Sequence, residues 1–459
     1  MKNQYISFVL LLSFTLLNSS CRKDFLDTKP DKSLLIPKSL SDMQAILDNT
    51  GVMNNSAGLY NIATDDYQVS SANLASFKTI PERNSYIWAS DIFESSVSLD
   101  WNISYQQIFY ANVVLDGLKN IEVTIANKDE FNRVKGSALF FRAMALYQLA
   151  IQFAGAYDPA TASSLNGIPI KLVSDVNEKP GRGTLSQVFD QIVKDLTDAL
   201  PLLPVKNPLY LTRPSQLAVN ALLARVYLYM GNYDKAETTA DKCLEISPTL
   251  LDYNTLSKTS TRPISFNAAA NSEVIFWQFM LPYSFGTAVI TSISDDIISS
   301  YDANDLRKLI FLRDRGNGIQ TFKGNYTGDS YTFIGLAIDE IYLIRAECRA
   351  RHNNIQGAME DLNTLMKKRW NNSVTYLPFS APDVEGSMKL ILKERRKELI
   401  TRGTRWTDLK RLNLDSRFKT TIKRSINNVE YVLSPNSNRY MFPIPQNEID
   451  GSGIDQNQR

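Results

Sequence analysis

The stretch NALLARVYLYMGNYDKAETTADKCLEISP, residues 220–248, determines the fold expected for this chain. Strong helix formers such as Ala, Leu and Arg fill residues 221–230 and predict a helix. Gly231 follows at the place where a helix commonly ends in a left-handed residue. A second helix is expected from Tyr233 to the residue before Pro248, because proline has no amide hydrogen to continue the helical hydrogen bonds. The stretch therefore predicts two short helices joined by a tight turn.

Small residues on one face of the second helix allow the two helices to pack closely: Ala236, Ala240 and Cys243. The register also resembles the tetratricopeptide pattern, in which four positions match: Leu223, Tyr227, Ala236 and Pro248. Because one helical hairpin cannot bury both of its faces, further hairpins must pack against it. The expected fold class is therefore mainly α, built from tetratricopeptide-like helical hairpins.

The composition is ordinary for a globular chain with a sizeable core. Of 459 residues, 44% are hydrophobic and 21% are charged. Fifty basic and 48 acidic residues give a net charge of +2, so no overall field favours nucleic acid. Three cysteines do not make a disulfide framework, and we expect Cys243 and Cys348 to be buried on apolar helical faces. The single histidine, His352, leaves little room for a metal site and is expected in a solvated loop.

The amino-terminal end carries an export pattern. Residues 5–17 form an apolar run of 13 residues, too short to cross a bilayer comfortably and typical of the core of a signal peptide. Small and polar residues then lead to Cys21, as in a bacterial lipoprotein signal, whose cysteine becomes the lipidated first residue. We expect a signal peptide at residues 1–20 and lipidation of Cys21; an ordinary secretory signal with an incidental cysteine is the alternative. No later apolar run reaches transmembrane length.

The remaining chain is expected to form one interwoven body at residues 39–459, with parts at about 39–250 and 251–459, after a polar tether at residues 21–38. Periodicity predicts helices in six further places: residues 41–49, 102–121, 129–153, 184–200, 339–370 (a hairpin) and 387–413, the last interrupted at Gly403. Two large inserts, residues 54–100 and 250–336, lack this periodicity. We expect loops and short strands there, with a strand at residues 273–279.

Aromatic residues of the inserts are the main candidates for ligand binding. Sugar rings expose C–H faces that stack on Trp and Tyr, while Asp, Asn and Arg hydrogen-bond the hydroxyl groups. The candidate platforms are Trp88 with Tyr86, and Trp277 with Tyr283 or Tyr301. The alternative for each ring is that it fills a local core, because aromatic side chains bury large areas.

Two pairs of adjacent carboxylates also stand in the inserts: Asp65 with Asp66, and Asp295 with Asp296. Glycoside hydrolysis needs two carboxyl groups roughly 5 to 10 Å apart across the bond, whereas adjacent residues commonly serve turns or contact hydroxyls and cations. We name Asp65 and Asp66 as candidate ligand contacts and no catalytic residue. The basic stretch at residues 393–405 is interleaved with Glu394 and Glu398, which predicts a helix stabilised by i,i+4 ion pairs rather than a nucleic-acid patch.

Together these features resemble the SusD/RagB family of outer-membrane nutrient-binding lipoproteins of Bacteroidetes. The resemblance rests on four stretches in the family's order: CRKDFLDTKP at residues 21–30, KGSALFFRAMALYQLAIQFAG at 135–155 followed by GIPI at 167–170, ALLARVYLYMGNYDKA at 221–236, and ERRKELITRGTRWTDLKRLN at 394–413 with FPIPQNEI at 442–449. It implies a SusD-like α/α superhelix with four tetratricopeptide-like units and irregular inserts that build the ligand surface. It also implies binding without catalysis, and a place over a SusC-like TonB-dependent transporter. Among the candidate residues only Cys21 belongs to a family motif.

The resulting hypothesis is capture of oligosaccharides for that transporter, with the chain lipid-anchored at Cys21 on the extracellular side of the outer membrane. A peptide-binding member of the same family, a glycoside hydrolase and a tetratricopeptide adaptor that binds only protein are the alternatives. No cofactor, catalytic metal or nucleic-acid partner is expected, the membrane is contacted through the lipid alone, and a structural calcium ion is left open.

Overall fold

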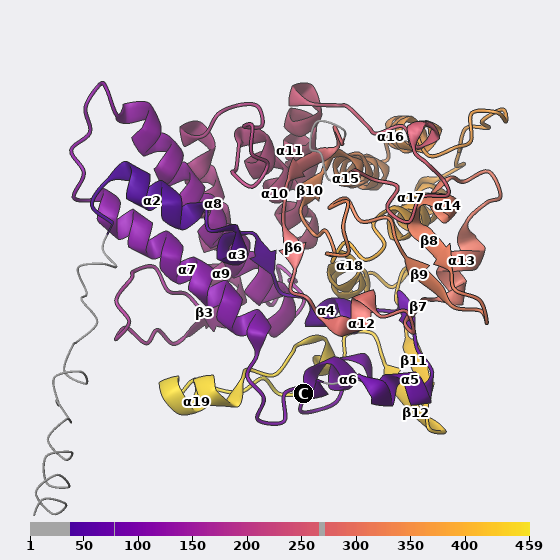
Figure 1. The fold of residues 1–459 in the computed structure, drawn as a ribbon, viewed down its shortest axis with the longest axis horizontal. Coiled ribbons are helices and arrows are strands. Elements are labelled where there is room, and N and C mark those ends of the chain that lie inside the picture. Colours follow the sequence, from indigo (N-terminus) through magenta and orange to yellow (C-terminus); the bar gives the residue numbers. More distant parts are fainter. Residues whose placement is uncertain (1–36, 78, 266–270) are drawn as a thin grey trace, which may run out of the picture.

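The hairpin of residues 220–248 forms as predicted in the computed structural model, which describes residues 37–77, 79–265 and 271–459 (Figure 1). Its two helices are α10 (Gln216–Tyr229) and α11 (Tyr233–Ile246), and Gly231 between them has φ = 72°. Asn232 caps α11 by accepting a hydrogen bond from the Lys235 amide. The expected signal peptide and Cys21 lie outside the described residues.

Helix pairs pack side by side around this hairpin, and the structure is 48% helix and 9% strand, as the mainly α prediction requires. One arm of the molecule is made of α2 (Leu40–Leu47), α7 (Leu99–Leu118), α8 (Lys128–Phe153) and α9 (Leu185–Ala199). The other arm contains α15 (Ile338–Arg351), α16 (Ile355–Lys367), α17 (Val384–Glu398) and α18 (Arg405–Leu412). The α10–α11 pair lies between them, because α10 contacts α9 and α11 packs on α15 (Figure 1).

Local signals set the ends of these helices. Thr184 and Gln187 form a capping box at the start of α9. Asn353, at φ = 62°, makes the turn between α15 and α16, and Gly403, at φ = 73°, separates α17 from α18. Helix α7 begins at Leu99, earlier than expected, because the Ser98 hydroxyl accepts a hydrogen bond from the Trp101 amide and caps it.

The first insert contains more helix than the sequence predicted. Besides the two-residue strands β1 (Asn55–Ser56) and β2 (Tyr67–Gln68) it holds three short helices: α4 (Leu59–Ile62), α5 (Ser71–Ser76) and α6 (Ile80–Tyr86). A further short helix, α3 (Thr50–Met53), comes just before it. Helices this short carry too few residues for a periodic pattern to be visible. The second insert contributes α12 (Ser284–Thr287), α13 (Asp295–Ser300) and α14 (Arg307–Phe311).

In the described residues the strands form six two-stranded sheets, two of which join the two inserts. Strand β1 pairs in parallel with β6 (Phe279–Met280), and β2 pairs with β7 (Ser292–Ile293) in an antiparallel arrangement. The other antiparallel pairs are β5 (Val274–Phe276) with β10 (Leu336–Ala337), β8 (Leu312–Asp314) with β9 (Gln320–Phe322), β3 (Asn166–Pro169) with β4 (Arg182–Thr184), and β11 (Ile422–Ile426) with β12 (Val429–Leu433). The predicted strand at residues 273–279 is therefore divided between β5 and β6.

Glu394 and Glu398 of α17 form ion pairs mainly with arginines outside the helix and not in the predicted i,i+4 pattern. Arg307 binds Asp305, Glu394 and Glu398 at once, and Arg369 binds Glu398 and Glu273. All of these side chains are buried. Their partners come from the second insert and from the segment just after α16, because a buried carboxylate pairs with whichever cation the tertiary packing brings to it. The stretch at residues 393–405 is therefore structural, as expected, and its ion pairs connect the second insert to the helices.

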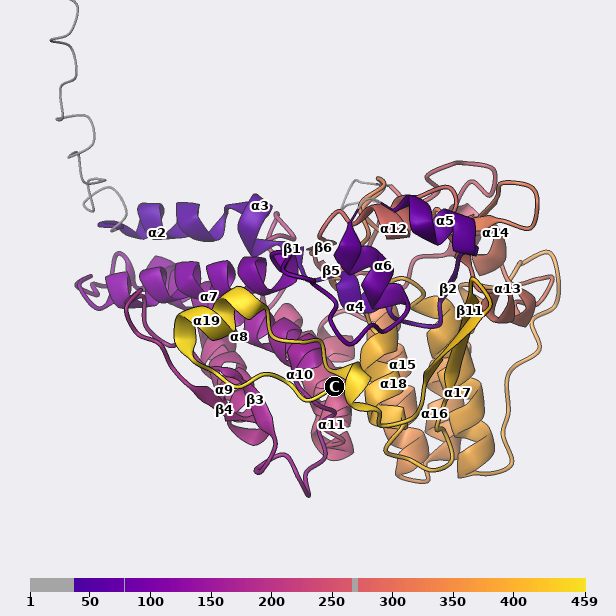
Figure 2. The same cartoon turned by 90° about the horizontal axis from the view of Figure 1, so that it is seen from below.

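The carboxyl-terminal tail after α18 returns across the molecule to the first helices (Figure 2). It runs through β11 and β12 to α19 (Gln446–Ser452), and the Asn457 amide then donates to the carbonyls of Phe153 and Phe442. The buried thiols of Cys243 and Cys348 are in the core, as predicted. His352 is exposed at the turn after α15, as expected, and contacts Asp234 and Glu237. In the part of the chain that the structure describes, no helix is both long and apolar enough to cross a membrane.

Candidate functional site

Trp88 and Tyr86, the first predicted stacking platform, are buried. Trp88 is 1% exposed and donates through Nε1 to the carbonyl of Ala63 at 2.9 Å. The guanidinium of Arg424, from β11, lies 4.3 Å from the Trp88 ring and 3.7 Å from the Tyr86 ring. The same guanidinium donates to the main-chain carbonyls of Tyr86 and Thr64. This pair therefore clamps the tail to the first insert and presents no ring face to a ligand in this structure.

Trp277 and Tyr301, from the second platform, are also buried, at 7% and 6% exposure. Trp277 packs edge-on against Phe279, with ring centroids 5.8 Å apart. The Tyr301 hydroxyl donates to the Lys397 carbonyl at 2.9 Å, and the Arg307 guanidinium lies 5.7 Å from its ring. Phe276 beside Trp277 is buried as well, so both faces of this strand are covered. Neither ring presents a face to a ligand in this structure.

Asp65 and Asp66 are held by arginines of the carboxyl-terminal helices. Both oxygens of Asp65 accept from Arg405 at 2.7 Å, and Arg396 lies 3.1 Å from the same carboxylate. Burial opposes ionisation of Asp65, but the two guanidinium groups outweigh it and lower its pKa. Burial raises the pKa of Asp66. Arg396 lowers this pKa but does not outweigh burial, and the negative charge of Asp65 raises it further. The pair is engaged in structural ion pairs between the first insert and α17–α18.

Tyr283 is the one predicted aromatic that is half-buried and lines a hollow on the surface. Its hydroxyl donates to Asp100 Oδ1 at 2.7 Å, and Asp100 also accepts from the Leu59 amide and Gln152. Burial raises the pKa of the Tyr283 hydroxyl, with the negative charge of Asp100 adding to the effect. A Cβ at Gly58 would lie 3.1 Å from Tyr283 Cδ2 and 2.5 Å from Met280 Cγ, so glycine leaves room for the ring. The Tyr283 ring is therefore fixed in position.

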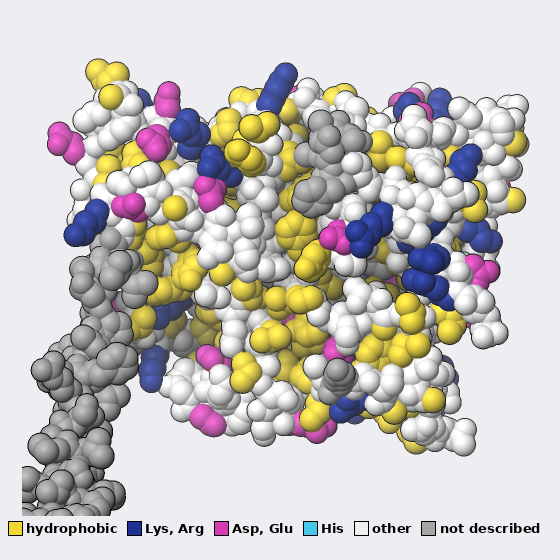
Figure 3. Space-filling view, in the orientation of Figure 1, with side chains coloured by type: hydrophobic (Ala, Val, Ile, Leu, Met, Phe, Trp, Pro, Cys, Tyr) yellow, Lys and Arg dark blue, Asp and Glu magenta, His cyan; other side chains and the backbone are white. Residues whose placement is uncertain are grey.

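The hollow beside this ring, which we call the Tyr283 groove, has a volume of about 390 Å³. Its lining combines α4, β2, the β6–α12 segment and residues 330–332: Asn61, Ile62, Tyr67, Met280, Leu281, Pro282, Tyr283, Gly286, Thr287, Ser330, Tyr331 and Thr332. Hydrophobic side chains gather on this face around α4, β6 and α12 (Figure 3). A further hollow of about 290 Å³ on the other side of Tyr283 is bordered by Ile80, Pro81 and Val97.

Two features suit the Tyr283 groove to a sugar. Tyr331 is 52% exposed, with its ring edge-on to Phe279 at 6.3 Å, so a ring face is free for stacking. Asn61 is 2% exposed; its amide nitrogen donates to the Tyr67 hydroxyl, while its Oδ1 has no hydrogen-bond partner among the described residues. A buried acceptor without a partner is unfavourable, and a ligand hydroxyl would supply the missing donor. Sequence reasoning missed both residues, because neither belongs to a motif and the turn that exposes Tyr331 is known only from the fold.

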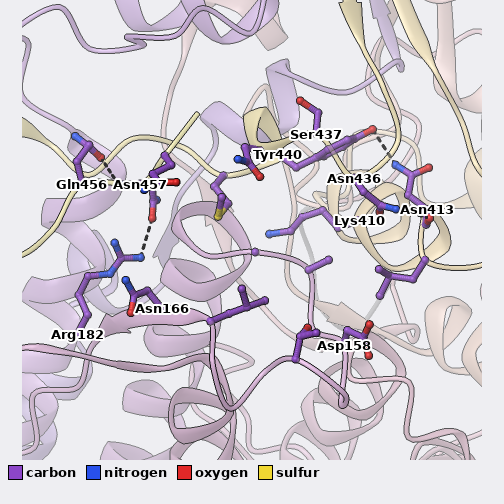
Figure 4. A pocket seen from close by; sticks show the side chains of 18 of the residues that line it. Asp158, Asn166, Arg182, Lys410, Asn413, Asn436, Ser437, Tyr440, Gln456 and Asn457 are labelled. Atoms are coloured by element: carbon purple, nitrogen blue, oxygen red, sulfur yellow. Dashed lines mark hydrogen bonds between the residues drawn. The ribbon is translucent and has the colours of Figure 1, made fainter.

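A larger hollow of about 680 Å³, which we call the tail pocket, lies between the end of α8, the end of α18 and the carboxyl-terminal tail (Figure 4). Its polar side chains largely bind one another: Arg182 donates to Asn457, and Asn413 donates to the Tyr440 hydroxyl. Lys410 donates to the carbonyls of Ile151 and Ala154, and burial lowers the pKa of Lys410 to about 7. Tyr440 is 4% exposed. The tail pocket therefore offers no aromatic face, and the Tyr283 groove is the better sugar site.

The fold and the site define a helical-hairpin scaffold whose irregular inserts carry a binding groove. Residues 24–228 match a family described as starch-binding and associating with the outer membrane, and residues 317–458 match the SusD family. The chain belongs to the SusD/RagB family. This is a family of non-catalytic, carbohydrate-binding proteins associated with the outer membrane, so the hydrolase alternative is excluded.

Solved structures share the fold over nearly their whole length. A SusD superfamily protein from Bacteroides thetaiotaomicron VPI-5482 is 24% identical with a TM-score of 0.74, covering 92% of this chain and 100% of its own. A SusD-like carbohydrate binding protein from Bacteroides vulgatus ATCC 8482 is 21% identical with a TM-score of 0.66, covering 91% and 97%. Another from Bacteroides fragilis NCTC 9343 is 16% identical with a TM-score of 0.67, covering 90% and 98%. No curated protein sequence matches the chain.

Among the residues that the structure describes, no group of three or more His, Cys, Asp and Glu side chains is arranged to hold a metal ion.

Proposed function

We propose that this protein captures oligosaccharides in the Tyr283 groove and delivers them to a SusC-like TonB-dependent transporter of the outer membrane. The observation that carries the proposal is the exposed Tyr331 ring in the same groove as the unpaired Asn61 Oδ1. Membership of a carbohydrate-binding family supports it. The carbohydrate-binding descriptions of two solved structures with this fold agree with it.

The proposed roles follow from exposure. Tyr331 and Tyr283 stack on the C–H faces of sugar rings, and Asn61 Oδ1 accepts from a sugar hydroxyl. The other residues predicted from the sequence are buried or held in ion pairs, and we assign them a structural role: Asp65, Asp66, Tyr86, Trp88, Trp277 and Tyr301. Because the Tyr283 ring is fixed through its bond to Asp100, little ordering entropy is lost when a ligand binds it.

Titration calorimetry of the purified soluble chain over a panel of oligosaccharides and peptides tests the ligand. We expect saturable binding of an oligosaccharide. Tyr331→Ala should weaken it about tenfold, the equivalent of about 1.4 kcal/mol, because it removes a stacking face. Leu377→Ala is the matched control, because Leu377 is 78% exposed and lies outside the groove. Binding of peptides without any glycan would show that the ligand class is wrong.

The membrane attachment is proposed to rest on a lipid at Cys21, with the body facing the extracellular side. Cells given labelled palmitate should incorporate it into the wild-type chain and not into Cys21→Ser. Co-purification of the lipidated chain with a TonB-dependent transporter from detergent-solubilised outer membranes tests the partner. A chain that is lipidated but purifies alone under mild detergent would contradict the transporter half of the proposal.

A further inference from the structure

A second hollow of about 260 Å³ continues the Tyr283 groove, and we call it the basic hollow. The two share five lining residues: Tyr67, Gly286, Thr287, Ser330 and Thr332. A ligand chain that lies in the groove therefore has a path into the basic hollow without leaving the surface.

The basic hollow is lined by four cationic side chains, Arg262, Arg313, Arg315 and Lys323, and by one carboxylate, Asp329. Lys and Arg side chains gather over β8 and β9 on this face (Figure 3). The whole chain has a net charge of only +2, so this concentration is local and does not follow from the composition. Asp314, next to Arg313, accepts a hydrogen bond from the Gly316 amide in the β8–β9 turn and is not part of the lining.

The cations are only partly neutralised by the protein. Arg262 pairs with Asp329 at 2.9 Å, and Arg315 donates to the Thr321 hydroxyl at 3.0 Å. Lys323 donates to the carbonyls of Lys258 and Ser260. The exposed side chain of Arg313 forms no hydrogen bond or ion pair with the described residues. At least one full positive charge therefore faces the hollow without a counter-charge.

Two further observations indicate an anionic occupant. Burial, and then the charge of Arg313, lower the pKa of Lys323, so these cations lie close enough to repel each other. Thr401, which is 3% exposed and lines the basic hollow, has a hydroxyl with no partner in the described part of the chain. A hydroxyl and a guanidinium are the donors that bind carboxylate and sulfate groups, and Arg can do so through two parallel hydrogen bonds.

We propose that the basic hollow is an anion-binding subsite and that the oligosaccharide is acidic, carrying carboxylate or sulfate groups. This inference rests on the proposed function, since it assigns the ligand class of the same groove. The anionic group of one sugar residue binds Arg313, Arg262 and Thr401 while neighbouring rings stack on Tyr331 and Tyr283.

Calorimetry with paired acidic and neutral glycans tests the subsite. Oligogalacturonate against its methyl ester addresses carboxylate, and dextran sulfate oligomers against dextran address sulfate. We expect one acidic member to bind at least about tenfold tighter than its neutral partner, because a hydrogen bond to a charged group contributes roughly 1.5–3 kcal/mol. Added salt should reduce the difference.

Arg313→Gln should remove most of the preference for the acidic glycan. The substitution breaks no side-chain hydrogen bond or ion pair in the described structure. Lys393→Gln is the matched control: Lys393 is also exposed, it lies outside the hollow, and the substitution removes the same charge. Equal affinity for acidic and neutral glycans, or a preference that survives Arg313→Gln, would overturn the subsite and leave the proposed function standing. If no glycan of either kind binds, or if one binds and Tyr331→Ala leaves its affinity unchanged, the proposed function itself is wrong.

Discussion

At the scale of single residues, the aromatic side chains divide into those that hold the fold and those that face a ligand. Trp88 is enclosed by Arg424 and Ala63, while Tyr331 is half in solvent. Sequence alone does not separate the two, because both are aromatic residues in irregular segments. The Arg424 guanidinium that covers Tyr86 comes from 338 positions away in the chain. A partner at that distance leaves no trace in local sequence.

Replacing these two residues should therefore have opposite effects. Trp88→Ala is expected to lower the free energy of unfolding by about 3–5 kcal/mol, because it opens a cavity around Arg424. Tyr331→Ala should change stability by no more than about 0.5 kcal/mol. Urea denaturation followed by circular dichroism measures both. A Trp88→Ala variant that is as stable as the wild type but has lost glycan affinity would show that Trp88 belongs to the ligand site.

At the scale of elements, the long helices were predictable, whereas the short insert helices and most insert strands were not. Helix α11 (Tyr233–Ile246) is bounded by its cap Asn232 and by Pro248, signals that are local in the sequence. Strand β1 has two residues and exists only because β6 lies beside it. A long periodic segment predicts its own secondary structure, whereas a short strand forms only when its partner strand lies beside it. The groove is built from short elements of this dependent kind, so its position could not be derived from the sequence.

The two glycine turns between helices give a prediction at this scale. Gly231 and Gly403 have nearly equal positive φ, 72° and 73°. A Cβ at Gly231 would meet only Tyr233 Oη at 4.0 Å, whereas a Cβ at Gly403 would approach Tyr60 Oη at 3.0 Å and Ile334 at 3.4 Å. Gly231→Ala should cost about 1 kcal/mol of stability from backbone strain alone, and Gly403→Ala should cost more, on the order of 2–3 kcal/mol. Equal losses in thermal unfolding would show that the space around Gly403 does not matter.

At the scale of the whole molecule, buried ion pairs connect segments that are distant in sequence. Glu347 on α15 accepts from Arg411 on α18 at 2.6 and 2.7 Å and from Arg351 at 2.9 Å. Burial opposes ionisation, but Arg411 and Arg351 lower the pKa of Glu347 from 4.5 to about 2. A carboxyl group whose pKa is lower in the folded state contributes stability above its unfolded pKa and loses it as the pH falls toward the folded value.

Acid titration of stability tests this link. At neutral pH, Glu347→Gln should lower the free energy of unfolding by about 3 kcal/mol, the equivalent of that pKa difference. The gap between wild type and variant should close as the pH falls from about 4.5 to about 2, where Glu347 is protonated and neutral like glutamine. Urea midpoints at several pH values give the gap. A difference that is constant with pH would assign the effect to packing.

The pairing of β1 with β6 also has a consequence for the order in which parts of the molecule fold. Asn54, beside β1, donates its side-chain amide to the carbonyl of Trp277, 223 positions later. Since chains are synthesised from the amino end, the α4 wall of the groove exists long before the segment that completes it. Contacts of such separation are slow to form, because a long loop must close before they stabilise anything. The helices can assemble from near neighbours, so the binding groove is expected to be the last part of this protein to mature.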